Sequence, residues 1–321
     1  EYNNALTDLD GLSNLSSVGD ELYIGNNESL TSLNGLSSLS FVGGSFLIEN
    51  DEALTSLNGL SSLSWVQGIL GVMSNETLAD LDGLSGISAL NGELRVESNP
   101  ALTNLDGLSN LTSARAIRVN RNAALANLDG LSNLASVGVD GLIIASNPSL
   151  TSLAGLSTLV AVGGDLAISE NGSLTSIGGL SSLSSVGRDL SITSNDSLTT
   201  LDGLLGLSAV GGGLDIGENA VLASLGGLSN LRSVAWRLWI GNNGSLTSLD
   251  GLAGLTSVGL DLHIQSNNSL SSIDGLLGVT EWGGRFYILD NPSLCQSRVD
   301  AFAAGCGTCW LGGVDGNDSG C

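Results

Sequence analysis

Residues 243–266 read NGSLTSLDGLAGLTSVGLDLHIQS, and residues 267–290 repeat the pattern as NNSLSSIDGLLGVTEWGGRFYILD. One leucine recurs every 24 residues along the chain, apart from one interval of 23 and one of 25. These leucines are Leu6, Leu30, Leu54, Leu78, Leu102, Leu125, Leu150, Leu174, Leu198, Leu222, Leu246, Leu270 and Leu294. A short fixed period is the signature of a solenoid, whose turns bury their apolar faces against each other. The sequence therefore predicts a mainly β, parallel β-solenoid of about twelve turns.

Each repeat contains apolar residues with two different spacings. Leu262-His263-Ile264 and its equivalents alternate with period two, which predicts a short strand. Ser29-Leu30-Thr31 alternates in the same way and is expected to be extended as well. Leu9, Leu12 and Leu15 are three residues apart, which favours a tight bend or one turn of 3₁₀ helix. One turn is therefore expected to combine strands with a 3₁₀ bend.

Two polar or small residues recur at almost every turn. A glycine before the second leucine predicts either an unusual backbone angle or a corner too crowded for a Cβ atom. An asparagine after each strand is predicted to bond the backbone of adjoining turns, because its side chain both donates and accepts. We call these residues the Asn ladder: Asn27, Asn75, Asn99, Asn122, Asn147, Asn171, Asn195, Asn219, Asn243, Asn267 and Asn291, with Asn3 before them and Asp51 in place of one asparagine.

The two irregular intervals are expected to leave the core unchanged. The missing residue lies near 114–116 and the extra residue near 139–141, both in the predicted turn before a strand. Only the length of that connection should therefore change.

Charge and hydropathy exclude several kinds of partner. The 321 residues carry a net charge of −23, and all nine basic residues are arginine. Nucleic acid and anionic membranes repel such a surface. No apolar run reaches 18 residues, so no membrane insertion is expected. The acidity itself is expected mainly to keep the protein soluble, although cationic partners remain open.

Four cysteines, Cys295, Cys306, Cys309 and Cys321, lie within the last 27 residues. An even, clustered set predicts disulfides in an oxidising compartment, and a lone C-x₂-C is weak evidence for zinc. We expect the pairs Cys295–Cys306 and Cys309–Cys321, within a disulfide-bonded C-terminal cap. The predicted domains are a repeat solenoid, 1–294, and a Cys-rich cap, 295–321.

The two ends of the chain support further expectations. The sequence enters the repeat by Leu6 without a leader, as a mature secreted protein would. The first turn has no cap comparable with residues 295–321, so we expect either an upstream cover or end-to-end association.

The repeat resembles a leucine-rich repeat, and more closely the receptor L-domain type of extracellular solenoid. The resemblance is carried by Leu142-Ile143-Ile144-Ala145-Ser146-Asn147-Pro148-Ser149-Leu150, by Leu153-Ala154-Gly155-Leu156 and by Asn291-Pro292-Ser293-Leu294-Cys295. It covers residues 3 to about 295 and implies a right-handed, sheet-bearing solenoid outside the cell. Receptor L domains bind ligands through long insertions, which this regular chain lacks, so growth-factor binding is not implied.

The best candidate site is a group of aromatic side chains in the late repeats. Trp239, His263 and Tyr287 occupy the outward position of three consecutive predicted strands, and Trp236 lies three residues before Trp239. Such a row of rings can stack sugar rings or anchor a protein partner. The alternative is structural, with the rings covering the late sheet or stiffening it by cross-strand packing.

Other outward columns suggest alternatives. A threonine column resembles the flat face of ice-binding proteins, although hydroxyl rows also satisfy a sheet surface; it contains Thr7, Thr31, Thr55, Thr103, Thr151, Thr175, Thr199 and Thr247. An aspartate often precedes the repeated glycine, which favours turn chemistry over a calcium site. Asn14, Asn110 and Asn317 are the more plausible glycosylation sequons.

These observations predict a non-enzymatic binding or adhesion solenoid, secreted or on the cell surface. No catalytic residue, metal or cofactor is expected, because the chain has a single histidine and no phosphate-binding loop. The expected partners are proteins or carbohydrates at the cell surface, or copies of the chain itself, and not nucleic acid. One alternative is a self-assembling filament or layer subunit, and a second is an ice-binding protein using the Thr/Ser face.

Overall fold

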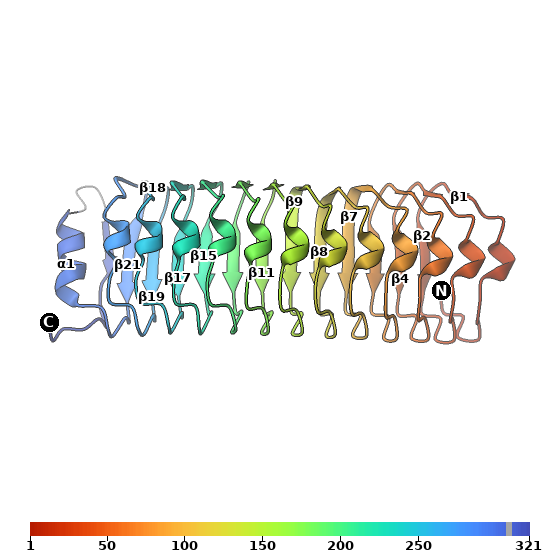
Figure 1. The fold of residues 1–321 in the computed structure, drawn as a ribbon, viewed down its shortest axis with the longest axis horizontal. Coiled ribbons are helices and arrows are strands. Elements are labelled where there is room, and N and C mark those ends of the chain that lie inside the picture. Colours follow the sequence, from red (N-terminus) through yellow and green to blue (C-terminus); the bar gives the residue numbers. More distant parts are fainter. Residues whose placement is uncertain (306–309) are drawn as a thin grey trace. The chain divides into compact units, whose positions relative to one another are not determined.

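The computed structural model describes residues 1–305 and 310–321. The chain divides into two compact units, Glu1–Leu159 and Val160–Cys321. Most turns pass through a 3₁₀ bend, a short strand, a corner and a longer strand, whereas three turns of the first unit join the two strands into one; within each unit the chain coils with a right hand (Figure 1). The predicted parallel β-solenoid is therefore confirmed in each unit.

The predicted 3₁₀ bends form at the leucines that are three residues apart. They are η1 (Asp10–Leu12), η2 (Asn34–Leu36), η3 (Asn58–Leu60), η4 (Asp82–Leu84), η5 (Asp106–Leu108), η6 (Asp129–Leu131) and η7 (Ala154–Leu156) in the first unit. In the second they are η8 (Gly178–Leu180), η9 (Asp202–Leu204), η10 (Gly226–Leu228), η11 (Asp250–Leu252) and η12 (Asp274–Leu276).

The first unit has two parallel sheets. The short strands are β1 (Ser17–Val18), β3 (Phe41–Val42) and β5 (Trp65–Val66), and the longer ones are β2 (Leu22–Gly25), β4 (Phe46–Glu49), β6 (Leu70–Met73), β7 (Ala89–Glu97), β8 (Ser113–Asn120) and β9 (Ser136–Ala145). The strands β8 and β9 shift register between Ala114 and Ala116, and then pair Ile117 with Leu142. The irregular intervals thus lie inside continuous strands and not in turns, but the core register is kept as predicted.

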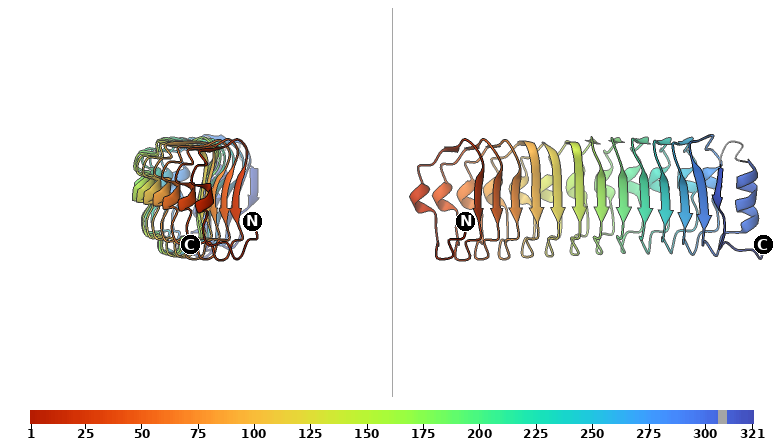
Figure 2. Two further views of the ribbon diagram at one scale, coloured as in Figure 1. Left: turned by 90° about the vertical axis from the view of Figure 1, so that its right-hand side faces the viewer. Right: turned by 180° about the vertical axis from the view of Figure 1, so that it is seen from behind.

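The second unit also has two rows of parallel strands, and those of the longer row all point the same way (Figure 2). The short ones are β10 (Ala161–Val162), β12 (Ser185–Val186), β14 (Ala209–Val210), β16 (Ser233–Val234), β18 (Ser257–Val258) and β20 (Glu281–Trp282). The longer ones are β11 (Leu166–Ser169), β13 (Leu190–Thr193), β15 (Leu214–Gly217), β17 (Leu238–Gly241), β19 (Leu262–Gln265), β21 (Arg285–Leu289) and β22 (Trp310–Gly313).

The segment Ser29–Thr31 was expected to be extended like the strands, and this expectation is wrong. No named strand contains it, and the N–H of Thr31 donates to the carbonyl of Thr7 on the preceding turn at 3.2 Å. Leu30 is nevertheless fully buried. Only the N–H and the hydroxyl group of Thr31 bond the preceding turn, whereas a strand would need a repeated pattern of main-chain bonds.

The repeated glycine is required by crowding. A Cβ atom on Gly107 would lie 1.8 Å from the carbonyl oxygen of Leu81, and one on Gly227 would lie 1.7 Å from that of Leu201. Gly11 is the equivalent glycine nearest residue 1, and a Cβ atom there would meet nothing within 4 Å. Of the two explanations offered by the sequence, the close approach of adjoining turns is therefore correct.

We expect Gly107→Ala to lower the free energy of unfolding by roughly 1–3 kcal/mol, because the methyl group would force two backbone segments apart. Gly11→Ala is the matched control, since the same methyl group enters open space. Urea denaturation of both variants measures the difference. Equal stabilities would show that glycine is not needed for the close approach.

The Asn ladder connects turns through main-chain and side-chain bonds. In Asn75 the backbone N–H and Nδ2 both donate to Oδ1 of Asn99, at 3.0 and 3.3 Å. Nδ2 of Asn75 also donates to the carbonyl of Ile48, at 3.2 Å. The ladder asparagines from Asn27 to Asn291 are buried. Each amide thereby satisfies peptide groups where the chain leaves a strand.

Just before each ladder residue the backbone adopts a left-handed conformation. Arg121 and Glu218, for example, have φ of 56° and 57°. Such angles are uncommon for residues other than glycine. The left-handed residue turns the chain sharply, and the asparagine that follows then points into the ladder. Each ladder residue is therefore preceded by one residue with a strained backbone.

At Asp51 the ladder has a carboxylate, which accepts hydrogen bonds but has no N–H to donate. Its Oδ1 accepts from the N–H and Nδ2 of Asn27, at 2.9 and 3.0 Å. Its Oδ2 is buried without a hydrogen-bond partner, whereas an asparagine would place a donor there. Burial raises the pKa of Asp51, although hydrogen bonds from Asn27 and the N-terminal charge act in the opposite sense. The folded state therefore binds this proton more tightly than the unfolded chain does.

We expect Asp51→Asn to stabilise the protein near neutral pH by about 1–3 kcal/mol, because it supplies the missing donor. The destabilisation caused by Asp51 is absent below about pH 3.9 and grows as the pH rises toward its raised pKa. The gain should therefore be smaller at pH 4 than at pH 7 in paired urea titrations. Asn75→Asp should show the reverse sign. A gain that does not change with pH would contradict the account.

The C-terminal segment begins with α1 (Gln296–Gly305), which buries Val299 and Phe302. The ring of Phe302 meets those of Trp282 and Phe286 edge-on, with centroids 5.8 and 5.6 Å away. These contacts place the helix over the last turn. The predicted boundary between residues 294 and 295 stays a prediction.

The predicted disulfide pairing is wrong. Cys295 bonds Cys321, with Cα atoms 5.7 Å apart, and Cys306 and Cys309 lie outside the described residues. The backbone of Asp318 forms an isolated parallel β-bridge with that of Cys295, and the N–H of Asp318 donates to the carbonyl of Leu294 at 2.8 Å. This backbone pairing brings the last residue beside Cys295.

Candidate functional site

The three predicted ring residues lie on the outer side of the second unit's longer strands. Trp239 on β17 is in register with His263 on β19, which is in register with Tyr287 on β21. All three side chains are half-buried. We call these three residues the aromatic face. Their common side follows from the period of two along each strand.

The indole of Trp239 lies on a floor of glycines. A Cβ atom on Gly217 would lie 1.9 Å from Cζ3 of Trp239, and one on Gly241 would lie 2.5 Å from its Cζ2. Gly217 belongs to the preceding strand, so the ring leans away from His263. The six-membered ring of the indole therefore occupies space that side chains on Gly217 and Gly241 would otherwise fill.

His263 and Tyr287 stack with centroids 4.4 Å apart and an angle of 16° between the ring planes. The three rings were expected to form one ladder, and within the described residues only these two make a ring contact. Burial lowers the pKa of His263, Asp261 raises it, and the positive charge of Arg237 lowers it. The imidazole is therefore neutral near pH 7.

A fixed ion pair borders the indole. Arg237 donates from Nε and Nη2 to the two carboxylate oxygens of Asp215, at 3.1 and 2.5 Å. Asp215 is in register with Trp239, so the two side chains leave the same face of the sheet from neighbouring strands. The guanidinium remains largely exposed, with a side-chain exposure of 61%. Sequence reasoning missed this pair, because its partners are 22 residues apart and belong to adjoining turns.

Trp236 does not join the aromatic face. It lies in the turn between β16 and β17, where its N–H donates to the carbonyl of Gly212 at 3.0 Å. Its side chain is 55% exposed, and Leu260, one turn further on, is 50% exposed. These two residues form a separate apolar surface at the corner of the turns.

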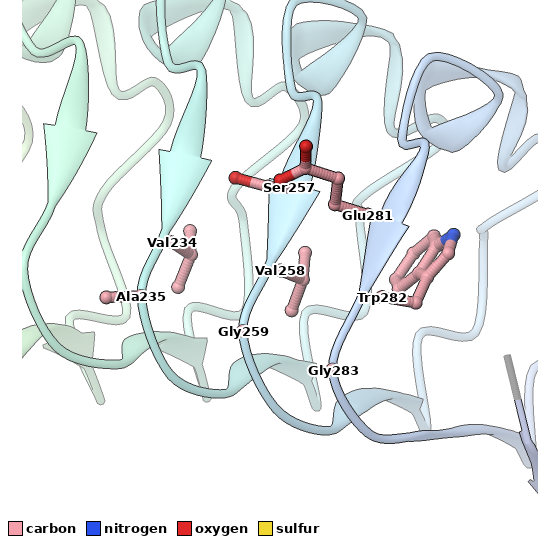
Figure 3. A pocket seen from close by; sticks show the side chains of 8 residues that line it. All are labelled: Val234, Ala235, Ser257, Val258, Gly259, Glu281, Trp282 and Gly283. Carbon is pink, nitrogen blue, oxygen red and sulfur yellow. The ribbon is translucent and has the colours of Figure 1, made fainter. Parts of the chain in front are cut away.

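An open groove of about 500 Å³ follows the short strands of the second unit (Figure 3). It is lined by Val234, Ala235, Ser257, Val258, Gly259, Glu281, Trp282 and Gly283. The carboxylate of Glu281 reaches toward Ser257 in Figure 3. Glu281 is the one acidic or basic residue of this lining, so the groove offers no pair of groups for acid–base chemistry.

The threonine column uses its hydroxyl groups internally. Oγ1 of Thr31 donates to the carbonyl of Thr7 at 3.2 Å, and Oγ1 of Thr103 to that of Ala79 at 3.4 Å. The side chains are exposed but tied to the preceding turn. This arrangement satisfies the surface carbonyls and leaves hydroxyl lone pairs toward solvent.

The remaining polar candidates have structural contacts. Burial raises the pKa of Asp82, and Asp80 and Asp106 raise it further, but no metal-binding group of three or more His, Cys, Asp or Glu side chains occurs among the described residues.

Asn317, a predicted sequon, accepts from the N–H of Asn291 at 3.3 Å and donates to the carbonyl of Ile288 at 2.9 Å. Asn317 thus adds a rung to the Asn ladder, a role that its spacing of 26 residues concealed.

A second charged group lies on the first unit's sheet. Arg95 and Arg118 both donate to the carboxylate of Glu93, whose side chain is 13% exposed. Burial alone would raise the pKa of Glu93, but the bonds and charges of the two arginines lower it. The group keeps one net positive charge, and the bonds from Arg95 on β7 and Arg118 on β8 to a single carboxylate fit a role in holding these strands together.

Comparison with known proteins matches no family model and no curated protein. Among solved structures, an internalin (inlF) from Listeria monocytogenes is 15% identical, with 87% of this chain and 84% of that chain covered and a TM-score of 0.45. A TLR13–ssRNA13 complex is 15% identical, with 84% of this chain and 62% of that chain covered and a TM-score of 0.19.

The fold is a leucine-rich-repeat-like parallel β-solenoid. Because both TM-scores are below 0.5, this assignment rests on the chain's own stacked turns of about 24 residues.

We expect the imidazole of His263 to titrate below its ordinary pKa of about 6.5. Replacing Arg237 with Gln removes a positive charge and should raise this pKa, whereas Asp261→Asn should lower it further. The chain has one histidine, so proton NMR follows the titration without ambiguity. A midpoint at or above 6.5, or no response to Arg237→Gln, would refute the described environment.

Proposed function

We propose that the protein is a non-enzymatic binding or adhesion solenoid that contacts its partner through the aromatic face. The observation that carries this proposal is the close seating of Trp239 against two glycines, one strand away from the His263–Tyr287 stack. Rigid aromatic surface loses little side-chain entropy on binding, so such residues often dominate binding energy. The partner would be a protein or a carbohydrate.

A secreted or cell-surface location is part of the proposal. The Cys295–Cys321 disulfide supports it, because disulfides persist in oxidising compartments. Among the described residues no helix has the length and hydropathy to cross a bilayer. The acidic net charge makes nucleic acid an unfavourable partner. The lone histidine, stacked on Tyr287, supports a binding role over catalysis.

The direct test is binding of the labelled protein to arrays of purified glycans and secreted proteins. We expect the double variant Trp239→Ala, Tyr287→Ala to bind at least about tenfold more weakly, since paired hot-spot side chains are lost. The matched control is Phe41→Ala, Trp65→Ala, which removes two exposed rings from strands β3 and β5. Equal losses in both variants, or none in the first, would contradict the proposed face.

Self-assembly into a filament or layer is a second candidate. Phe41 and Trp65, in register on neighbouring strands, are 40% and 37% exposed. Exposed apolar groups of this kind favour association. Ordered polymers in negative-stain electron microscopy, lost in Phe41→Ala, Trp65→Ala, would support this role; dispersed particles at high concentration would exclude it.

Ice binding through the Thr/Ser face stays an untested alternative. The exposed, regularly spaced threonines support it, and their internal hydrogen bonds weaken it. Thermal hysteresis and ice recrystallisation assays decide this alternative independently of the aromatic face.

A further inference from the structure

The glycines next to Trp239 are a feature that an aromatic ring would not need merely to be exposed. Any side chain on Gly217 would collide with the indole, and so would any on Gly241. Tyr287 is seated similarly, since a Cβ atom on Gly312 would lie 2.4 Å from its Cε1. Glycine in a strand normally weakens it. Three glycines therefore provide the space that two rings need to lie against the sheet.

Hydrogen-bonding groups of fixed direction lie next to Trp239, because Asp215 is in register with it and Arg237 lies two residues before it. The two bonds between Arg237 and Asp215 hold both planar groups in place. The free guanidinium hydrogens are donors, and the carboxylate lone pairs are acceptors. A flat apolar surface bordered by fixed donors and acceptors matches a sugar ring, which has an apolar C–H face and a rim of hydroxyl groups.

We propose that the aromatic face binds a neutral glycan, with one pyranose ring packed on the indole of Trp239 and its hydroxyl groups bonded by Asp215 and Arg237. This inference rests on the proposed function. Tyr287 lies two strands from Trp239, roughly 10 Å at ordinary strand spacing. A short linear oligosaccharide running across the strands reaches both rings.

The surroundings favour a glycan over a protein. On the three longer strands that precede β17, the outward residues level with Trp239 are Ala167, Ser191 and Asp215. Two residues after His263 and Tyr287, on the same strands, lie Gln265 and Leu289. The core of a protein interface is richer in apolar and aromatic side chains. The net charge of −23 also disfavours acidic polysaccharides. The ligand class that remains is an uncharged, hydroxyl-rich chain.

Affinity electrophoresis of the full chain tests this inference. The gels contain hydroxyethylcellulose, xyloglucan or galactomannan as neutral probes, and polygalacturonate as an acidic probe. We expect retardation by at least one neutral probe and none by polygalacturonate. Trp239→Ala should weaken that retardation about tenfold, which corresponds to about 1.4 kcal/mol.

A second variant tests the glycine floor. Gly217→Val keeps Trp239 but displaces its indole, so it should also weaken retardation while circular dichroism shows a folded chain. Trp65→Ala, which removes an exposed indole from β5, should bind as the parent does. Unchanged retardation in Gly217→Val, with the fold intact, would overturn the assigned geometry.

The outcome separates the two proposals. If no neutral probe retards the parent chain but a purified protein binds it in a Trp239-dependent way, the glycan inference is wrong and the binding face stands. If a glycan binds equally well to parent and Trp239→Ala, both are wrong. Retardation by polygalacturonate alone would also overturn the inference.

Discussion

The close approach of backbone to backbone at one glycine in each turn is the constraint on which the structure depends. At Gly107 and its equivalents a carbonyl of the preceding turn lies where a Cβ atom would be. The Asn ladder then bonds turns at that separation, as Asn75 does with Asn99. Because both devices act at equivalent positions, strands pair in register, and outward residues of successive turns form straight columns. The aromatic face is one such column.

Much of the fold could be predicted because the repeat places one physical requirement at one sequence position. The 3₁₀ bends, the strands at Leu-x-Ile and the crowded glycine all follow from local spacing. Ser29–Thr31 could not be distinguished from a strand, since alternation reports burial and not the bonds that neighbouring turns make. The Cys295–Cys321 bond depends on how residues 310–321 return to Leu294, which leaves no trace in cysteine spacing.

The candidate site was predictable in position but not in conformation. Period two along the strands places Trp239, His263 and Tyr287 in one column, and the sequence shows this directly. The lean of the indole depends on Gly217 and Gly241, whose importance appears only when the ring is seen above them. The ion pair with Asp215 likewise requires the turns to be stacked. Trp236, close in sequence, lies outside the column because the corner intervenes.

The most direct measurement is ¹H–¹⁵N NMR of the tryptophan indoles, of which the chain has five. The protein would be titrated with oligosaccharides prepared from a neutral polysaccharide that retards it. The account predicts a saturable shift of the Trp239 signal, assigned by its loss in Trp239→Phe, while the Trp65 signal stays in place. A shift of Trp65, or of Trp282 in the groove of the short strands, with Trp239 unchanged would contradict the central claim.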